Sequence, residues 1–236
     1  MGYSAFFLFF SENFSTFFSY FPLDLPHRDF MSIEFLSNGT FVLVGTYGVY
    51  AYDPYRHTYN VYRLSGSDES IASNSGFVCS YLQSDSILWV GNWVVGLTRI
   101  QLKDGHQTQY LWSKEKTKHQ GILAICPSPF DGAGNELWLA TISGIMRFDM
   151  NRETFSLHAA SGNATSSDVP GSGFCFLPDA DGILWMGTYK GLHKLDVNKQ
   201  SFRHLILNMP EVYRNSRLHA ICWLDAAFEG DRQAYL

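Results

Sequence analysis

The chain has 236 residues, a formal net charge of −5, 46% hydrophobic residues and 17% charged residues. This composition belongs to a folded globular protein and excludes disorder as the main state. The acidic balance, without an extended basic cluster, argues against nucleic acid as a partner.

The chain opens with a phenylalanine-rich segment that differs from a signal peptide. No Lys or Arg precedes Arg28, and residues 11–13 (Ser-Glu-Asn) interrupt the apolar run. No stretch of about 18 apolar residues occurs anywhere, so we expect no membrane segment in this chain. Residues 7–20 can be laid over residues 49–62 at an offset of 42. The start therefore predicts the third and fourth strands of a blade whose first two strands are missing.

Cysteines and tryptophans recur along the chain at one period. The cysteines are separated by 47, 49 and 47 residues and stand at Cys79, Cys126, Cys175 and Cys222. The tryptophans are separated by 49 and 47 residues and stand at Trp89, Trp138 and Trp185, and we place Leu43 in the equivalent position of the first unit. A period of this length is typical of repeat architectures.

Each unit has the same order of marker residues. After the tryptophan run comes a small residue, at Gly45, Gly91 and Gly187. A glycine then opens the next strand, at Gly48, Gly96, Gly144 and Gly191. That strand closes on an aspartate, at Asp53, Asp149 and Asp196, whereas the second unit has Gln101 there and makes its own turn at residues 103–105. An apolar strand carrying the cysteine precedes each tryptophan run. Each unit thus predicts four short antiparallel strands.

Units of four strands in about 47 residues are the signature of β-propeller blades. A lone four-stranded sheet cannot bury both faces, so we expect the tryptophans to pack between blades. The sequence predicts an all-β fold, one propeller domain or propeller fragment over residues 1–236. Its predicted parts are a partial blade at 1–21, complete blades at 31–64, 76–113, 121–159 and 173–207, and a partial blade at 218–236.

Residues 183–196, with Trp185, Gly187, Gly191 and Asp196, resemble the two-component regulator propeller repeat. In that family, found in Bacteroidetes, such repeats form the extracytoplasmic, glycan-responsive sensor of hybrid two-component histidine kinases. The resemblance implies a periplasmic or extracytoplasmic sensor propeller for signal transduction, without catalysis in this chain. The kinase domain of such proteins is absent from these residues.

Catalytic and metal motifs were sought separately. The sequence holds no Gly-x-Ser-x-Gly, no P-loop and no His-Glu-x-x-His, so we expect no enzyme activity and no cofactor. Streptogramin-lyase-like propellers are an alternative, but their Trp-Phe-Thr-Glu style of repeat is missing. The cysteines predict small buried side chains and no metal site, because equivalent blade positions lie roughly 10 Å apart and zinc needs sulfur within ~2.3 Å.

The repeat phase predicts where a ligand binds. The connections between strands D and A of successive blades and between strands B and C emerge on one face, which we call the loop face. Its aromatic side chains can stack on sugar rings, while amide and basic groups supply hydrogen bonds. The candidate binding residues are Tyr47, Asn92, Trp93, Tyr189, Lys190 and Arg214, with Trp93 foremost. A purely structural role for the two tyrosines stays open.

Two functional classes follow: a sensor that binds an oligosaccharide or related extracellular ligand, and a platform that docks another protein. Residues 219–224 predict the first strand of a further blade, and the chain stops as the next strand begins. A closed five-bladed ring is possible, but we favour an arc of a larger propeller. Unpaired edge strands of such an arc would promote self-association.

Overall fold

A computed structural model describes residues 8–10, 17–19, 30–63, 76–113, 120–128, 131–141, 144–157, 173–179, 181, 183–188, 191–196, 201–205, 222–225 and 232–235. The chain divides into two compact units. The first consists of Met1–Val90 with Arg99–Thr108, and the second of Gly91–Thr98 with Gln109–Leu236. The described residues form strands, turns and bends, and none of them belongs to a helix with the length and hydropathy needed to cross a membrane.

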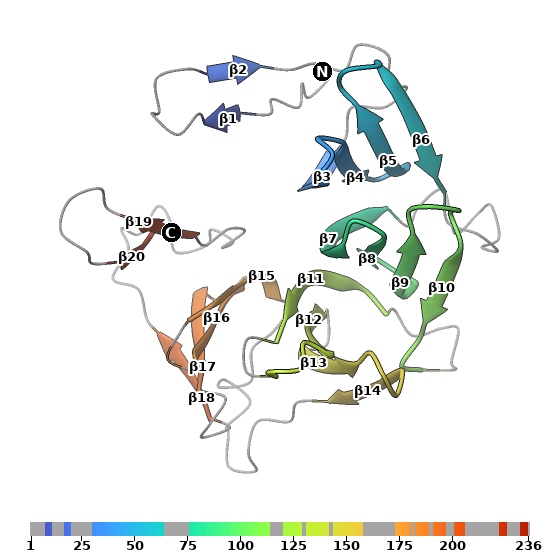
Figure 1. The fold of residues 1–236 in the computed structure, drawn as a ribbon. Helices are drawn as coiled ribbons and strands as arrows, with labels where there is room; N and C mark the ends of the chain where they lie inside the picture. Colours follow the sequence, from blue (N-terminus) through green and yellow to red (C-terminus); the bar gives the residue numbers. More distant parts are fainter. Residues whose placement is uncertain are drawn as a thin grey trace. The chain divides into compact units, whose positions relative to one another are not determined.

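Four sheets of four strands make up most of the described chain, and in each sheet the strands follow one another in sequence order (Figure 1). The first contains β3 (Phe30–Phe35), β4 (Phe41–Gly45), β5 (Gly48–Asp53) and β6 (Thr58–Tyr62). The second contains β7 (Phe77–Ser84), β8 (Ile87–Asn92), β9 (Gly96–Gln101) and β10 (Gln107–Tyr110). The third contains β11 (Ile122–Pro127), β12 (Glu136–Thr141), β13 (Gly144–Asp149) and β14 (Thr154–Leu157). The fourth contains β15 (Gly173–Pro178), β16 (Ile183–Thr188), β17 (Gly191–Asp196) and β18 (Ser201–Leu205). The predicted all-β propeller fold with four-stranded antiparallel blades is confirmed, and we call these sheets the first to fourth blades.

Two further hairpins lie near the chain ends. Strand β1 (Leu8–Phe10) pairs with β2 (Phe17–Ser19), and β19 (Cys222–Asp225) pairs with β20 (Arg232–Tyr235), both antiparallel. Phe10 lies opposite Phe17, as Tyr52 lies opposite Tyr59 in the first blade. This is the register that the offset of 42 residues predicted.

The register of the first blade corrects one sequence equivalence. Trp138 lies opposite Arg147, which stands two residues before Asp149. Trp185 lies opposite Lys194, which stands two residues before Asp196. In the first blade the residue two before Asp53 is Ala51, and it lies opposite Val42. Val42, rather than Leu43, therefore holds the tryptophan position. Gly45 lies opposite Gly48. The residues that lie opposite the corresponding glycines, Gly144 and Gly191, are Thr141 and Thr188. Gly45 is therefore equivalent to these threonines and not to Gly187.

Within each compact unit, two successive blades pack through alternating side chains of their second strands, because neighbouring residues of a strand point to opposite faces. In the first unit, Val42 and Val44 form a buried cluster with Leu88 and Val90 of the next blade. In the second unit, Trp138 and Ala140 form the corresponding cluster with Leu184 and Met186. The same two strand positions meet in both units, so the tryptophan position belongs to the packing between blades, as predicted.

The three tryptophans differ in burial. Trp89 and Trp138 are buried, whereas Trp185, which we expected to be mostly buried, is half-buried. Each ring carries a cationic group 5.4 to 5.9 Å from its centroid, supplied by Arg99, Arg147 and Lys194. Such a separation is within the range of cation–π attraction. This basic residue stands three positions after the repeat glycine, a sequence signal that we had not used.

The repeat glycines and aspartates shape the two hairpins of each blade. Gly96 has a φ of +83°, and a Cβ there would lie 2.6 Å from the carbonyl oxygen of Tyr110. Only glycine fits this backbone without strain. At the other hairpin, the Asp149 carboxylate accepts the backbone N–H groups of Asn151 and Arg152, and the Asp53 carboxylate accepts those of Tyr55 and Arg56. These aspartates therefore fix the turn between the third and fourth strands.

The described cysteines, Cys79, Cys126 and Cys175, form no disulfide bond. Cys126 lies opposite Trp138, whereas Cys175 lies opposite Gly187, two positions further along the strand. The cysteines of these two blades are thus on one face but not at one repeat position. Burial raises the pKa of Cys126 to about 12 and that of Cys175 to about 11, so both thiols stay protonated at neutral pH.

Candidate functional site

Of the six residues predicted to bind a ligand, the structure describes three. Tyr47 is 53% exposed in the two-residue turn between β4 and β5, and Trp93 is 44% exposed in the turn between β8 and β9. Tyr47 belongs to the first compact unit and Trp93 to the second. Tyr189, Lys190 and Arg214 lie outside the described residues.

Asn92 has a different role from the one we expected. Its side chain is fully buried, and Oδ1 accepts hydrogen bonds from the backbone N–H groups of Val94, at 2.8 Å, and Val95, at 3.1 Å. An asparagine that binds the backbone two and three residues ahead stabilises a turn. Asn92 therefore holds the loop that carries Trp93, and a ligand cannot reach it.

Gln120 braces the same loop from the connection that precedes β11. Its backbone N–H donates to the carbonyl of Val94 at 3.1 Å. Its buried side chain also accepts the N–H of Ser113 and donates to the carbonyl of Ser113. Asn92 and Gln120 thus together fix the backbone that follows Trp93. No feature of the sequence singled out Gln120, because its role depends on a long-range contact.

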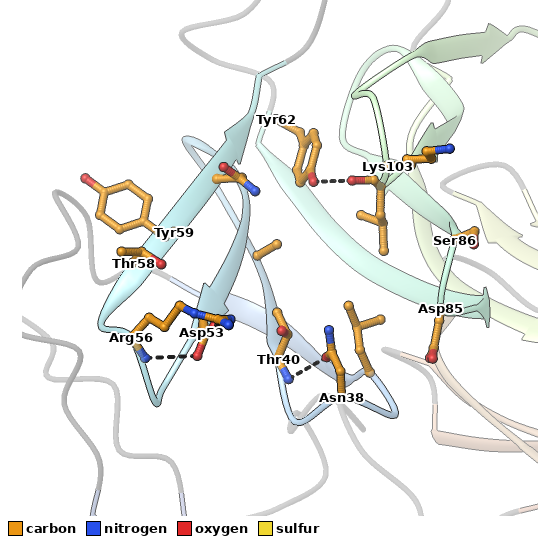
Figure 2. Close-up of a pocket in the computed structure, with 14 residues that line it drawn as sticks. Asn38, Thr40, Asp53, Arg56, Thr58, Tyr59, Tyr62, Asp85, Ser86 and Lys103 are labelled. Carbon is orange, nitrogen blue, oxygen red and sulfur yellow. Dashed lines mark hydrogen bonds and ion pairs between the residues drawn. The ribbon is translucent and has the colours of Figure 1, made fainter.

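The opposite edge of the sheets, which we call the turn face, holds a pocket in the first unit. Its volume is about 350 Å³, and residues of the first and second blades line it (Figure 2). The apolar floor consists of Leu36, Ala51 and Leu102, which also pack against the buried cluster between these blades. Polar side chains surround this floor: Asn38, Thr40, Asp53, Thr58, Asn60 and Asp85.

Three hydrogen bonds join the blades at this pocket. The hydroxyl of Tyr62 donates to the carbonyl of Leu102 at 2.6 Å, and the hydroxyl and backbone N–H of Ser37 donate to the carboxylate of Asp85. Figure 2 shows Tyr62 at one end of the pocket and Asn38 with Asp85 at the other. The two blades that form the walls of the pocket are therefore held at a fixed spacing.

The carboxylates of the pocket are engaged by neighbouring donors. The N–H and guanidinium of Arg56 hold the pKa of Asp53 below its ordinary value, and hydrogen bonds from Ser37 lower the pKa of Asp85. Arg56 also forms an ion pair with Asp53, with a distance of 2.8 Å between Nη1 and Oδ2. Both acids are ionised at neutral pH, and each already has at least one donor.

A second pocket lies at the same repeat position of the third blade. It has a volume of about 730 Å³ and is lined by Glu136, Arg147, Asp149 and Arg152 among others. Asp149 and Arg152 correspond to Asp53 and Arg56, and form a similar ion pair at 3.5 Å. Sequence reasoning directed attention to the loop face and missed both pockets of the turn face. The repeated aspartate with a basic residue three positions later was the available signal.

Within the described residues, no group of three or more His, Cys, Asp or Glu side chains is placed to hold a metal ion. The buried thiols of Cys126 and Cys175 stay protonated at neutral pH, which removes their nucleophilicity. The Trp93 loop offers an exposed aromatic ring, and the pockets offer hydrogen-bonding groups and small apolar areas.

Neither a protein-family model nor a curated protein matches the chain, but solved structures match its fold. The extracellular domain of a protein assigned to the hybrid two-component systems of B. thetaiotaomicron is 22% identical, with a TM-score of 0.60 over 77% of this chain and 25% of that one. The extracellular domain of a one-component system of B. thetaiotaomicron is 18% identical, with a TM-score of 0.57 over 79% of this chain and 25% of that one. The chain spans about a quarter of the length of each.

A chain of the mitotic checkpoint complex also matches, with 14% identity and a TM-score of 0.56 over 82% of this chain and 52% of that one. Since such different proteins share the fold, the fold alone does not determine function. The sequence resemblance to sensor propellers is confirmed at the level of fold.

Proposed function

We propose that this chain is the ligand-sensing propeller region of an extracytoplasmic signal-transduction sensor, and that it has no catalytic step of its own. The observation that carries the proposal is the likeness of fold to two extracellular domains of bacterial one-component and two-component systems. The Leu-Trp-hydrophobic-Gly-Thr repeat, which resembles sensor propellers, supports the same function. Localisation outside the cytoplasm is part of the proposal.

The proposed ligand is a carbohydrate or a related extracellular molecule, recognised on the loop face. Trp93 is the residue best suited to this task, because it exposes an aromatic ring on a backbone that Asn92 and Gln120 hold in place. A rigid, exposed aromatic ring loses little conformational entropy when a ligand stacks on it. Tyr47, Tyr189, Lys190 and Arg214 remain proposed binding residues.

Thermal unfolding of the purified chain with a panel of oligosaccharides tests this proposal. A ligand that binds the folded state raises the unfolding midpoint once its concentration exceeds the dissociation constant. We expect at least one oligosaccharide to stabilise the chain and the Trp93→Ala variant to lose most of that stabilisation. Leu111→Ala is the matched control, since Leu111 is 49% exposed and follows β10 in the same compact unit.

Equal stabilisation of the wild type and the Trp93→Ala variant would remove Trp93 from the site. If no member of the panel stabilises the wild type, the carbohydrate proposal is wrong. Stabilisation by another protein chain alone would favour the interaction platform instead.

A further inference from the structure

We propose that the pocket between the first and second blades on the turn face binds one neutral, polyhydroxylated ring such as a sugar residue. This site lies at the edge of the sheets opposite to the loop face, so it does not depend on Trp93 or on the function proposed above. Its volume of about 350 Å³ lies in the lower part of the range of small-molecule sites, about 300 to 1,000 Å³.

The lining of the pocket is amphipathic. Thr40 is two residues before Val42, and Asp53 two residues after Ala51, so these side chains share the blade face that packs on the second blade. Thr58 lies opposite Asp53, and Asn60 lies opposite Ala51, on that same face. Hydroxyl, carboxylate and amide groups thus surround an aliphatic floor. A sugar ring has the complementary form, with C–H groups on its faces and hydroxyl groups on its rim.

Hydrogen bonds between the two blades fix the shape of the pocket before a ligand binds. The hydrogen bonds Tyr62 to Leu102 and Ser37 to Asp85 join the two blades at this pocket, and Figure 2 shows Tyr62 and Asp85 at opposite ends of it. A ligand therefore meets walls that are already positioned, and binding avoids the cost of ordering them.

The charged groups that line the pocket favour a neutral ligand. Asp53 is paired with Arg56, and Asp85 accepts two hydrogen bonds from Ser37, so each carboxylate is already partly satisfied. Arg56 and Lys103 line the pocket beside these two carboxylates, so the charges of the lining balance and neither an anionic nor a cationic ligand meets an unopposed charge. A neutral hydroxyl group can donate to a carboxylate oxygen and accept from an N–H group at the same place. The pocket therefore favours a neutral polyol over either kind of ion.

Isothermal titration calorimetry and saturation-transfer NMR on the whole chain test this site. The probes are D-glucose, D-galactose, D-mannose and N-acetyl-D-glucosamine, with D-glucuronate and D-glucosamine as their anionic and cationic counterparts. We expect saturable binding of at least one neutral sugar. The Thr58→Val/Asn60→Ala double variant should weaken it at least about tenfold, the effect of losing hydrogen bonds worth about 1.4 kcal/mol.

Thr154→Val is the matched control. Thr154 occupies in the third blade the place of Thr58, since it lies opposite Asp149 as Thr58 lies opposite Asp53, and both threonines are exposed. The control should bind the sugar like the wild type. All three substitutions in these two variants replace exposed side chains. The unfolding midpoint should therefore change little, and any loss of affinity is local.

Three results would overturn the proposal: no saturable binding of any neutral sugar, tighter binding of a charged counterpart, or unchanged affinity in the Thr58→Val/Asn60→Ala variant. Measuring Trp93→Ala in parallel separates the two sites. A loss of binding in Trp93→Ala alone places the ligand on the loop face and leaves the turn-face pocket without a ligand.

Discussion

At the scale of single residues, the tryptophans of the second, third and fourth blades share two interactions. A cationic side chain from the neighbouring strand lies over each ring, and the indole N–H donates to a polar side chain near the end of the first strand or just after it. That acceptor is Gln83 for Trp89, Ser128 for Trp138 and Asp179 for Trp185. The indole is therefore satisfied as a polar group while its apolar surface is buried, which is how proteins accommodate buried tryptophan.

The different burial of these rings predicts different costs of removal. Trp138→Ala should lower the free energy of unfolding by about 3 to 5 kcal/mol, because a fully buried ring leaves a cavity. Trp185→Ala should cost less, since its ring is half-buried and already in partial contact with water. Urea unfolding followed by circular dichroism measures both values. An equal or larger cost for Trp185 would show that burial is not what the ring contributes.

Single residues also mark where sequence reasoning succeeded and failed. Trp93 was predicted to be exposed from its place in an inserted loop, and it is. Its neighbour Asn92 was assigned to the ligand, although an asparagine that follows a strand in a short turn is suited to bind its own backbone. Gln120 was not found, because nothing local distinguishes a glutamine that braces a loop from one that faces solvent.

At the scale of strands and hairpins, turn length determines which residues are equivalent. The two-residue turn between β4 and β5 places Gly45 opposite Gly48, and this shifts the tryptophan position of the first blade to Val42. A shift of one residue would turn every side chain of the strand to the other face. Aligning the small residues alone could not detect this, whereas counting back from Asp53 gives the observed register. Val42 and Ala51 replace a tryptophan and its cation together.

The aspartate turns predict a dependence of stability on pH. Hydrogen bonds from the Arg152 and Asn151 N–H groups and the charge of Arg152 keep the pKa of Asp149 below its ordinary value of 3.8. A carboxyl group whose pKa is lower in the folded state stabilises the fold above its unfolded pKa, and this contribution is lost as the pH falls through the folded pKa. Asp149→Asn should therefore destabilise the chain at pH 7, and the effect should shrink in acid as the pH falls well below 3.8.

A double-mutant cycle of Asp149→Asn and Arg152→Gln at pH 7 and in acid isolates the charge contribution, because asparagine can still accept the turn hydrogen bonds. We expect a small favourable coupling at pH 7 that disappears in acid. A coupling that is unchanged in acid would mean that the carboxylate charge does not stabilise the turn.

At the scale of the whole molecule, the 47-residue period predicted the number of strands in each sheet and their order. It did not predict the turn-face pockets, because these depend on which side chains of two neighbouring blades lie at one edge. Ring closure and self-association through edge strands remain predictions for solution measurements of molecular mass.

The cysteine thiols report on the integrity of the packed blades. A rise in pKa from 9.0 to about 12 lowers the thiolate fraction of Cys126 at pH 8 roughly a thousandfold. Peptide mass spectrometry after alkylation with iodoacetamide should therefore show Cys126 reacting slowly in the native chain and rapidly in denaturant. If Cys126 reacts equally fast in both conditions, its burial in the cluster between the third and fourth blades is wrong.

The central claim is that rigid blades present a preformed loop to an extracellular ligand. Hydrogen–deuterium exchange of the whole chain, with and without the oligosaccharide that stabilises it most, tests this claim directly. We predict the largest slowing of exchange at the amides of Val94, Val95 and Gln120, which hold the Trp93 loop, with smaller changes in the strands of the second and third blades. Stabilisation of the chain without additional slowing at these three amides would contradict a ligand site at Trp93.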